Sequence, residues 1–169
     1  LLMGSDEDLA TLRKEPRFTE LAHAARANGR TVPERQLDFW VGSWVVRDAA
    51  GNFLGRNVIT QAQKGHVVRE AWTGSTGGTG ESSNFYDPGR GRWRQVWVDD
   101  QGSVVEYDGR YEDGAMRFEG RASLASGGTA LARVAFHENA DGTVRQHAEQ
   151  STDGGRTWTT TFDGHYARE

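Results

Sequence analysis

Polar and aromatic residues alternate along three short stretches in the middle of the sequence, near residues 66–73, 81–87 and 93–99. In a β-strand, residues two positions apart point to the same side of the sheet. One side of these stretches therefore carries, in chain order, Glu70, Trp72, Asn84, Tyr86, Gln95 and Trp97. Aromatic rings beside a few polar groups are typical of a pocket for a small, largely hydrophobic molecule. We predict that the three aromatic residues form its walls and that the three polar residues orient the ligand.

Glu70 is the first candidate for a catalytic residue, because it lies between Arg69 and Trp72 in a stretch that must bury something. A carboxyl group enclosed in such a pocket has a raised pKa and can act as a general acid or base. The alternative to a binding protein is therefore a cofactor-independent isomerase or cyclase acting on a hydrophobic molecule. Glu106 could complete a glycosidase-type pair with Glu70, although two solvated strand residues are the simpler interpretation.

The sequence leaves the orientation of these three stretches open. If each stretch is turned over, the opposite set of side chains faces the pocket. That set consists of Arg69, Ser83, Phe85, Arg94 and Val96.

The five histidines show none of the spacings of common metal sites. His137 and His147 flank the Asp141-Gly142 turn at similar distances, so we expect them almost opposite each other on one face. Two exposed histidines are the simpler interpretation, and a two-histidine metal site or a haem ligand is the alternative. We predict no metal and no cofactor.

The elements that must position these residues are about ten short strands between Phe39 and the C-terminus. Turn sequences such as Asp113-Gly114 recur at intervals of about 8 to 12 residues, with no helical pattern between them. We place the strands near residues 40–48, 53–61, 66–73, 81–87, 93–99, 103–111, 115–124, 129–138, 143–151 and 158–167. This pattern predicts an all-β fold, a closed up-and-down antiparallel barrel of eight to ten strands. An open sandwich is the second choice.

Two of the predicted strands have a clear inner face. In the last strand, Trp158, Phe162 and Tyr166 share one side, and in residues 115–124 the apolar side includes Met116. The glycine-rich residues 74–80 lack the lysine and the following helix of a phosphate-binding loop. We expect a mobile hairpin loop there, a candidate gate to the barrel.

The N-terminal region differs from the rest of the chain. Residues 5–28 have apolar residues at helical spacings, with Pro16 as a break. We expect residues 1–30 to form a helical strap packed on a barrel of residues 31–169. The alternative is a partner-binding module, because residues 8–18 resemble the tail of tetratricopeptide-type helical arrays.

Composition excludes several classes of function. The chain of 169 residues has 20 basic and 24 acidic residues, a net charge of −4, and no basic block, which argues against nucleic-acid binding. The absence of cysteine excludes disulfides and thiolate metal sites. No apolar run approaches the roughly 20 residues of a membrane span. We expect a soluble protein, cytoplasmic or exported with its targeting segment removed, whose oligomeric state the sequence does not indicate.

Four segments carry a resemblance to a known family: residues 38–44, 84–88, 93–99 and 151–158. The first contains Gly42 and Trp44, the Gly-x-Trp signature of lipocalins. The whole span from Leu37 to Tyr166 resembles an uncharacterised bacterial family of lipocalin-like, calycin-type β-barrel domains of unknown function. The resemblance implies a barrel in which Trp44 plugs the closed end and a basic residue near the last strand, here Arg168, stacks on it. It implies no activity and so no catalytic residues.

Residues 151–158 also resemble the Asp-box of sialidases, S-x-D-x-G-x-T-W. That motif is a hairpin turn in which the aspartate bonds local backbone and the tryptophan packs beneath. A single copy cannot build a propeller, whose blades recur about every 40 residues. We therefore expect Asp153 and Trp158 to have a structural role.

Overall fold

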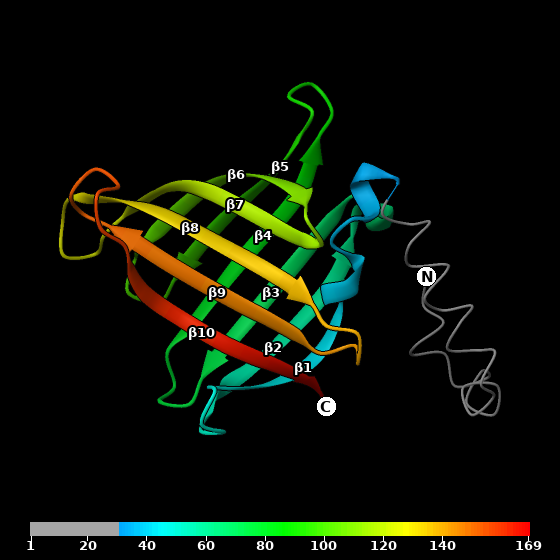
Figure 1. The fold of residues 1–169 in the computed structure, drawn as a ribbon, viewed down its shortest axis with the longest axis horizontal. Coiled ribbons are helices and arrows are strands. Elements are labelled where there is room, and N and C mark those ends of the chain that lie inside the picture. The colour runs from blue at the N-terminus through cyan, green and yellow to red at the C-terminus, as the bar shows by residue number, and fades with distance from the viewer. Residues whose placement is uncertain (1–30) are drawn as a thin grey trace.

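The computed structural model describes residues 31–169, in which ten antiparallel strands form one closed barrel (Figure 1). The predicted fold class is confirmed, and the open sandwich is excluded. The strands are β1 (Gly42–Arg47), β2 (Phe53–Ala62), β3 (Val67–Gly74), β4 (Thr79–Asp87), β5 (Arg92–Asp99), β6 (Val104–Glu112), β7 (Ala115–Ser123), β8 (Thr129–Glu138), β9 (Val144–Ser151) and β10 (Thr159–Arg168). The ends of every strand agree with the prediction to within two residues. The predicted helical strap, residues 1–30, lies outside the described residues.

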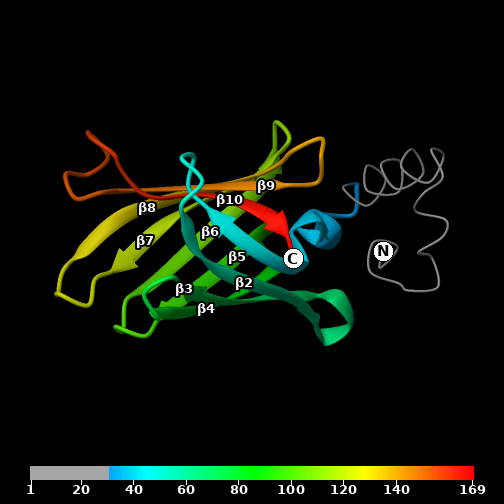
Figure 2. The ribbon, with the colours of Figure 1, turned by 90° about the horizontal axis from the view of Figure 1, so that it is seen from below.

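Each strand pairs with the next along the chain, and β1 pairs with β10 to close the barrel. The three short 3₁₀ helices among the described residues are η4 (Pro33–Arg35), η5 (Asp38–Trp40) and η6 (Gln63–Gly65). The helices η4 and η5 lie at the end of the barrel where β1 begins and β10 ends (Figure 2). We call this the closed end, and we call the opposite end, where β10 begins, the open end.

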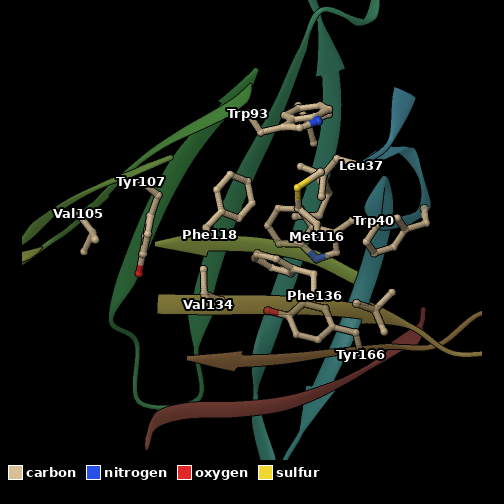
Figure 3. Packing of buried hydrophobic residues seen from close by; sticks show 14 of the residues in the cluster. Leu37, Trp40, Trp93, Val105, Tyr107, Met116, Phe118, Val134, Phe136 and Tyr166 are labelled. Atoms are coloured by element: carbon tan, nitrogen blue, oxygen red, sulfur yellow. The ribbon is translucent and has the colours of Figure 1, made fainter. Parts of the chain in front are cut away.

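An apolar core fills the closed end (Figure 3). Trp40 of η5 packs on Phe136 of β8, with ring centroids 4.6 Å apart, and Phe136 packs edge-to-face on Phe118 of β7. Trp93 of β5 is buried beside them and donates a hydrogen bond from Nε1 to the Pro33 carbonyl oxygen, at 3.1 Å. The core therefore ties the segment that precedes β1 to the barrel.

The tryptophan plug implied by the Gly-x-Trp signature is present. Trp44 is fully buried, and the guanidinium of Arg168 lies 3.9 Å from the centroid of its ring. Arg168 also donates from Nη1 to the Val41 carbonyl oxygen, at 2.6 Å. A side chain at Gly42, where φ is +142°, would overlap this guanidinium. The predicted contact between Arg168 and Trp44 is confirmed.

The glycine-rich residues 74–80 form a shorter loop than predicted, because β3 extends to Gly74 and β4 begins at Thr79. The amide of Ser75 donates to the Leu54 carbonyl oxygen at 2.8 Å. On the other side, the amide of Thr79 donates to the Asp100 carboxylate at 2.8 Å. The turn is thus bonded to the segments on both sides of it, and a gating movement stays a prediction.

The expected inner face of the last strand is correct only from Phe162 onward. The register with β9 shifts between Thr160 and Phe162, which is a β-bulge at Thr161. A bulge adds one residue to one strand and so reverses which side chains point inward. The prediction that Trp158 shares the inner face was therefore wrong. Its ring packs under Arg133 on the outer surface, 4.1 Å from the guanidinium carbon.

Candidate ligand-binding cavity

The middle strands turn their polar residues inward. Glu70 of β3, Asn84 of β4 and Gln95 of β5 have exposed fractions of only 6%, 0% and 3%. The orientation on which the predicted pocket depends is therefore the one that the structure adopts. The opposite set, which includes Arg69 and Ser83, lies on the outer face of the barrel.

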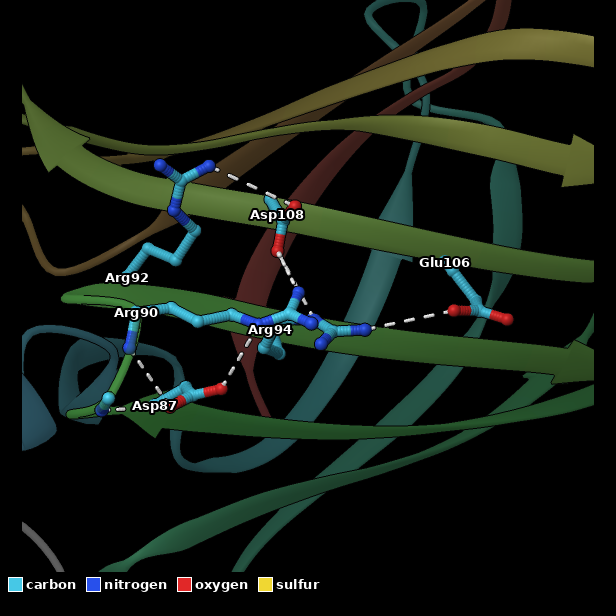
Figure 4. Close-up of polar contacts among 7 residues, drawn as sticks. Asp87, Arg90, Arg92, Arg94, Glu106 and Asp108 are labelled. Carbon is cyan, nitrogen blue, oxygen red and sulfur yellow. Dashed lines mark hydrogen bonds and ion pairs between the residues drawn. The ribbon is translucent and has the colours of Figure 1, made fainter.

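Glu106 lies on the outer face as well, so the possible carboxylate pair with Glu70 is excluded, and the simpler interpretation of a solvated residue holds for Glu106 but not for Glu70. Its side chain is mostly exposed and lies 3.7 Å from the guanidinium of Arg94 on the neighbouring strand (Figure 4). Asp108 lies 3.2 Å from Arg94 on the same surface. Glu106 pairs with Val96 across β5 and β6, and the next pair, Trp97 with Val105, points to the inside of the barrel. Glu70 and Glu106 thus face opposite sides of the barrel wall.

A cavity of about 180 Å³ lies inside the barrel, between its middle and the open end. It is lined by Glu70, Trp72, Gln95, Trp97, Val105, Tyr107, Val134, Gln146, Ala148, Gln150, Thr161, Phe162 and Tyr166. Thr161 is exposed and Trp72 is only half-buried, so the cavity reaches solvent at the open end. The bulge in β10 lets two consecutive residues, Thr161 and Phe162, border this space.

Glycines in the neighbouring strands fix where the two tryptophans lie. The ring of Trp97 covers Gly80 of β4 so closely that a Cβ at residue 80 would overlap it. The ring of Trp72 covers Gly55 of β2 in the same way, 2.6 Å from the position of a Cβ. A glycine within a strand often marks such a close approach. The other edge of Trp72 meets the ring of Phe162, edge-to-face at 5.6 Å between centroids.

Both carboxylate oxygens of Glu70 accept hydrogen bonds from neutral groups. Asn57 of β2 donates from Nδ2 to Oε1 at 2.7 Å, and Ser82 of β4 donates from Oγ to Oε2 at 2.7 Å. Asn57 Nδ2 also lies 3.3 Å from the hydroxyl of Tyr166, which in turn donates to Gln146 Oε1. Five strands, β2, β3, β4, β9 and β10, thus contribute to one polar cluster around a single acid.

A chain of hydrogen bonds leads to Glu70 from β5. Gln95 donates from Nε2 to Asn84 Oδ1 at 2.6 Å, and Asn84 donates from Nδ2 to Ser82 Oγ at 2.9 Å. Ser82 then donates to Glu70. Because every donor points the same way, the bonds polarise one another toward the carboxyl group. Asn84 also donates to the Val68 carbonyl oxygen at 3.1 Å, which anchors the chain to the barrel wall.

Burial raises the pKa of Glu70 to about 7, and the hydrogen bonds from Asn57 and Ser82 limit the increase. Burial also raises the pKa of Tyr107 and of Tyr166, and the charge of Glu70 adds to both increases. The two tyrosines therefore stay neutral near pH 7, while Glu70 exchanges a proton there. A group that titrates at the working pH is suited to acid–base chemistry.

The structure places four of the six predicted pocket residues around the cavity: Glu70, Trp72, Gln95 and Trp97. Asn84 is fully buried behind them, where it positions Gln95 and Ser82. Tyr86 lies toward the closed end, with its ring edge-to-face on Trp93 at 6.3 Å. It lies two residues beyond Asn84 on β4, too far from the open end to border the cavity.

Several residues of the site have no counterpart in the sequence-based prediction. Asn57 and Ser82 complete the Glu70 cluster, and Tyr107, Gln146 and Phe162 come from strands on the other side of the lumen. Alternation along the strand places Ser82 on the same face as Asn84, so Ser82 could have been predicted from the sequence. A single sequence does not predict that the strands carrying Tyr107 and Gln146 lie across the lumen from β3, because this arrangement depends on closure of the barrel.

The two histidines around the Asp141-Gly142 turn are not opposite each other. His137 pairs with Arg145, and His147 pairs with Ala135, so the register differs from the expected one by two residues. Both lie on the outer face, where burial, Arg117, Arg145 and His147 lower the pKa of His137. The part of the chain that the structure describes contains no group of three or more potential metal ligands. Neither histidine is placed to hold a haem inside the barrel.

Residues 151–158 form the tight turn that the Asp-box resemblance implies. The carboxylate of Asp153 accepts hydrogen bonds from the backbone amides of Arg156 and Thr157, at 2.9 and 3.0 Å, and these bonds lower its pKa. Trp158 donates from Nε1 to the Gly155 carbonyl oxygen at 3.2 Å. The carboxylate of Asp153 therefore has a structural role, which is to hold the backbone of the turn.

None of the known protein-family models matches this chain, and no curated protein matches it either. Within residues 31–169, every helix is too short to cross a bilayer. The function is therefore inferred from the barrel and the residues that line its cavity.

Proposed function

We propose that this protein binds a small, largely hydrophobic molecule inside the barrel. Trp72 and Trp97 form the walls of the site, and Glu70 and Gln95 are its polar contacts. The observation that carries the proposal is the hydrogen-bonded polar cluster facing an aromatic cavity that reaches solvent. A barrel that needed only stability would fill this space with apolar side chains, since burying an acid costs free energy. Asn84 supports the site by positioning Gln95.

The size of the cavity limits the ligand. Pockets for drug-sized molecules measure about 300–1,000 Å³, whereas this cavity measures about 180 Å³. An apolar cavity of about 150 Å³ takes up benzene. We therefore expect a ligand with one ring and a short polar substituent, too small to be a long-chain lipid.

Native mass spectrometry of the protein as isolated tests this proposal. We expect an adduct of low mass that is lost on denaturation. Ala148→Phe adds a ring inside the cavity and should remove the adduct, because Ala148 borders the site. Ala71→Phe adds the same ring on the exposed outer face of β3 and should leave the adduct in place. An adduct that persists in A148F, or that A71F removes equally, would contradict a site in the cavity.

A second candidate function is a cofactor-independent isomerase or cyclase. The observation that favours it is the position of Glu70 at the cavity with a pKa raised to about 7 by burial. Such a carboxyl group can hold a proton at neutral pH and also release it, which an isomerisation by proton transfer requires. The aromatic walls would exclude water from the reacting molecule.

Glu70→Gln separates the two functions. In an enzyme, the substitution should abolish turnover and leave the affinity for the hydrophobic molecule nearly unchanged. In a binding protein, wild type and E70Q alike should show no conversion of the molecule found by mass spectrometry. Conversion at an equal rate by both proteins would contradict Glu70 as the acid or base.

A further inference from the structure

The cavity has one acidic group and no basic group to balance it. Among the described residues that line it, Glu70 is the sole carboxyl group, and none is lysine, arginine or histidine. Within residues 31–169, the hydrogen bonds to Glu70 come from the neutral side chains of Asn57 and Ser82. When Glu70 ionises, its charge therefore has no partner of opposite sign in the cavity.

The polar cluster also contains a buried acceptor without a donor. The donor chain from Gln95 ends on Glu70, so its hydrogen atoms are used within the barrel wall. Asn57 Oδ1 is buried and accepts no hydrogen bond from another described residue. A buried acceptor without a donor is costly. At the cavity itself, the carboxylate oxygens of Glu70 are acceptors, so a ligand that can donate to them suits the site better than one that can only accept.

The remaining walls of the cavity suit a cation. The rings of Trp72, Trp97, Tyr107 and Phe162 all border it. The faces of aromatic rings attract ammonium groups, and they do so more strongly where water is excluded. A carboxylate ligand would find only neutral donors, such as the amides of Gln146 and Gln150, and the ring faces and the ionised Glu70 would repel its charge.

The unbalanced acidic group and the aromatic walls together indicate a class of ligand. We propose that the cavity selects small aromatic amines, with the ammonium group held by Glu70 and the ring between the tryptophans. This inference rests on the proposed binding function and specifies its ligand. It excludes fatty acids and other carboxylates as preferred ligands.

Three compounds of nearly equal size test the proposal: phenethylamine, phenethyl alcohol and phenylacetate. Binding is measured by quenching of tryptophan fluorescence and by isothermal titration calorimetry at pH 8 and pH 6. At pH 8 we expect the amine to bind at least about tenfold more tightly than the alcohol, and phenylacetate to bind most weakly. Glu70→Gln should bring the amine and the alcohol to within about twofold. Glu106→Gln, which removes a carboxylate from the outer face, should preserve the preference.

The comparison of pH values adds a test that needs no variant. The titratable groups near Glu70 are Tyr107 from β6 and Tyr166 from β10, both with pKa raised above the ordinary tyrosine value, and the neighbours from β2 and β4 are Asn57 and Ser82. Only Glu70 of this group titrates between pH 6 and 8. The affinity for the amine should therefore fall by up to about tenfold at pH 6, while that for the alcohol stays constant.

The outcomes separate this inference from the proposed function. If the alcohol binds as tightly as the amine at pH 8, or if the amine preference survives in E70Q, the amine assignment is overturned and binding in the cavity stands. If phenylacetate binds most tightly, the charge argument is wrong. If none of the three compounds binds, both the assignment and the proposed binding function fail.

Discussion

At the scale of single residues, Glu70 has the least favourable position in the barrel. Its carboxyl group is buried, its partners are the neutral Asn57 and Ser82, and its pKa is about 7. A buried acid with a raised pKa lowers the stability of the folded state wherever the unfolded chain would ionise. Sites that keep such a group are often functional sites.

The first prediction concerns the pH dependence of stability. Below about pH 4.5, Glu70 is protonated in both states. Between about pH 4.5 and 7 the unfolded chain loses the proton and the folded protein keeps it, so rising pH favours unfolding. The free energy of unfolding of the wild type, relative to E70Q, should therefore fall by about 3 kcal/mol between pH 4.5 and pH 8. Urea denaturation at a series of pH values measures this difference.

Glu106→Gln is the matched control, because it makes the same chemical change on the outer face of the barrel. The difference between wild type and E106Q should vary with pH by less than about 1 kcal/mol, as is usual for an exposed ion pair. If the difference between wild type and E70Q stays constant from pH 4.5 to pH 8, Glu70 is solvated in the folded protein.

At the scale of elements, glycines that face a large side chain on an adjacent strand shape both ends of the barrel. Gly80 and Gly55 make room for Trp97 and Trp72 at the open end. Gly42 makes room for the Arg168 guanidinium at the closed end. In each case the missing side chain of one strand lets a large group of another lie flat on the backbone.

Gly80→Ala should move the ring of Trp97 into the cavity, because a Cβ at residue 80 takes the place of the ring. We expect the affinity for phenethyl alcohol to fall at least about tenfold, and the tryptophan emission spectrum to shift. Gly78→Ala lies in the same hairpin, where a Cβ would come no closer than 3.9 Å to Asp100. G78A should bind as the wild type does. Equal binding by G80A would mean that Trp97 forms no part of the site.

Gly42→Ala tests the closure of the barrel by β1 and β10. The substitution strains a backbone with φ of +142° and also displaces Arg168 from Trp44. We expect it to lower the free energy of unfolding by about 2–4 kcal/mol. Gly51→Ala has positive φ but no neighbour within 4 Å, so it should cost about 1–2 kcal/mol. Equal losses would show that the Arg168 contact adds nothing to stability.

At the scale of the whole molecule, the barrel divides into a packed end and a hollow end. Trp40, Trp93 and Phe136 are buried at the closed end, whereas residues nearer the open end, such as Trp72 and Trp97, line the cavity. The packed core and the proposed binding site therefore lie in different halves of the same sheet. This division leaves room for polar side chains around the cavity.

Phe136→Ala should lower the free energy of unfolding by about 3–5 kcal/mol, because it removes the ring that packs on both Trp40 and Phe118. Phe53→Ala makes the same change at an exposed residue of β2 and should cost less than about 1 kcal/mol. Denaturation in guanidinium chloride measures both. Similar losses for the two variants would contradict a core centred on Phe136.

The sequence by itself determined the strands, their turns and most of their faces. Period-two alternation and turn residues act over a few neighbouring positions, so one sequence contains them in full. The inner faces of β7 and of the second half of β10 were predicted in this way, and so was the contact between Arg168 and Trp44, through a family resemblance.

Only the tertiary structure decided which side chains meet across the lumen. Closure brought Tyr107 and Gln146 to the same cavity as Glu70, and a bulge turned Trp158 outward. The register of β8 with β9 left His137 and His147 on one face but offset by two residues. The size of the cavity and the pKa of Glu70 depend on atoms from strands far apart in the chain. Local alternation fixes the direction of a side chain, but its solvation and its neighbours depend on the packing of the entire barrel.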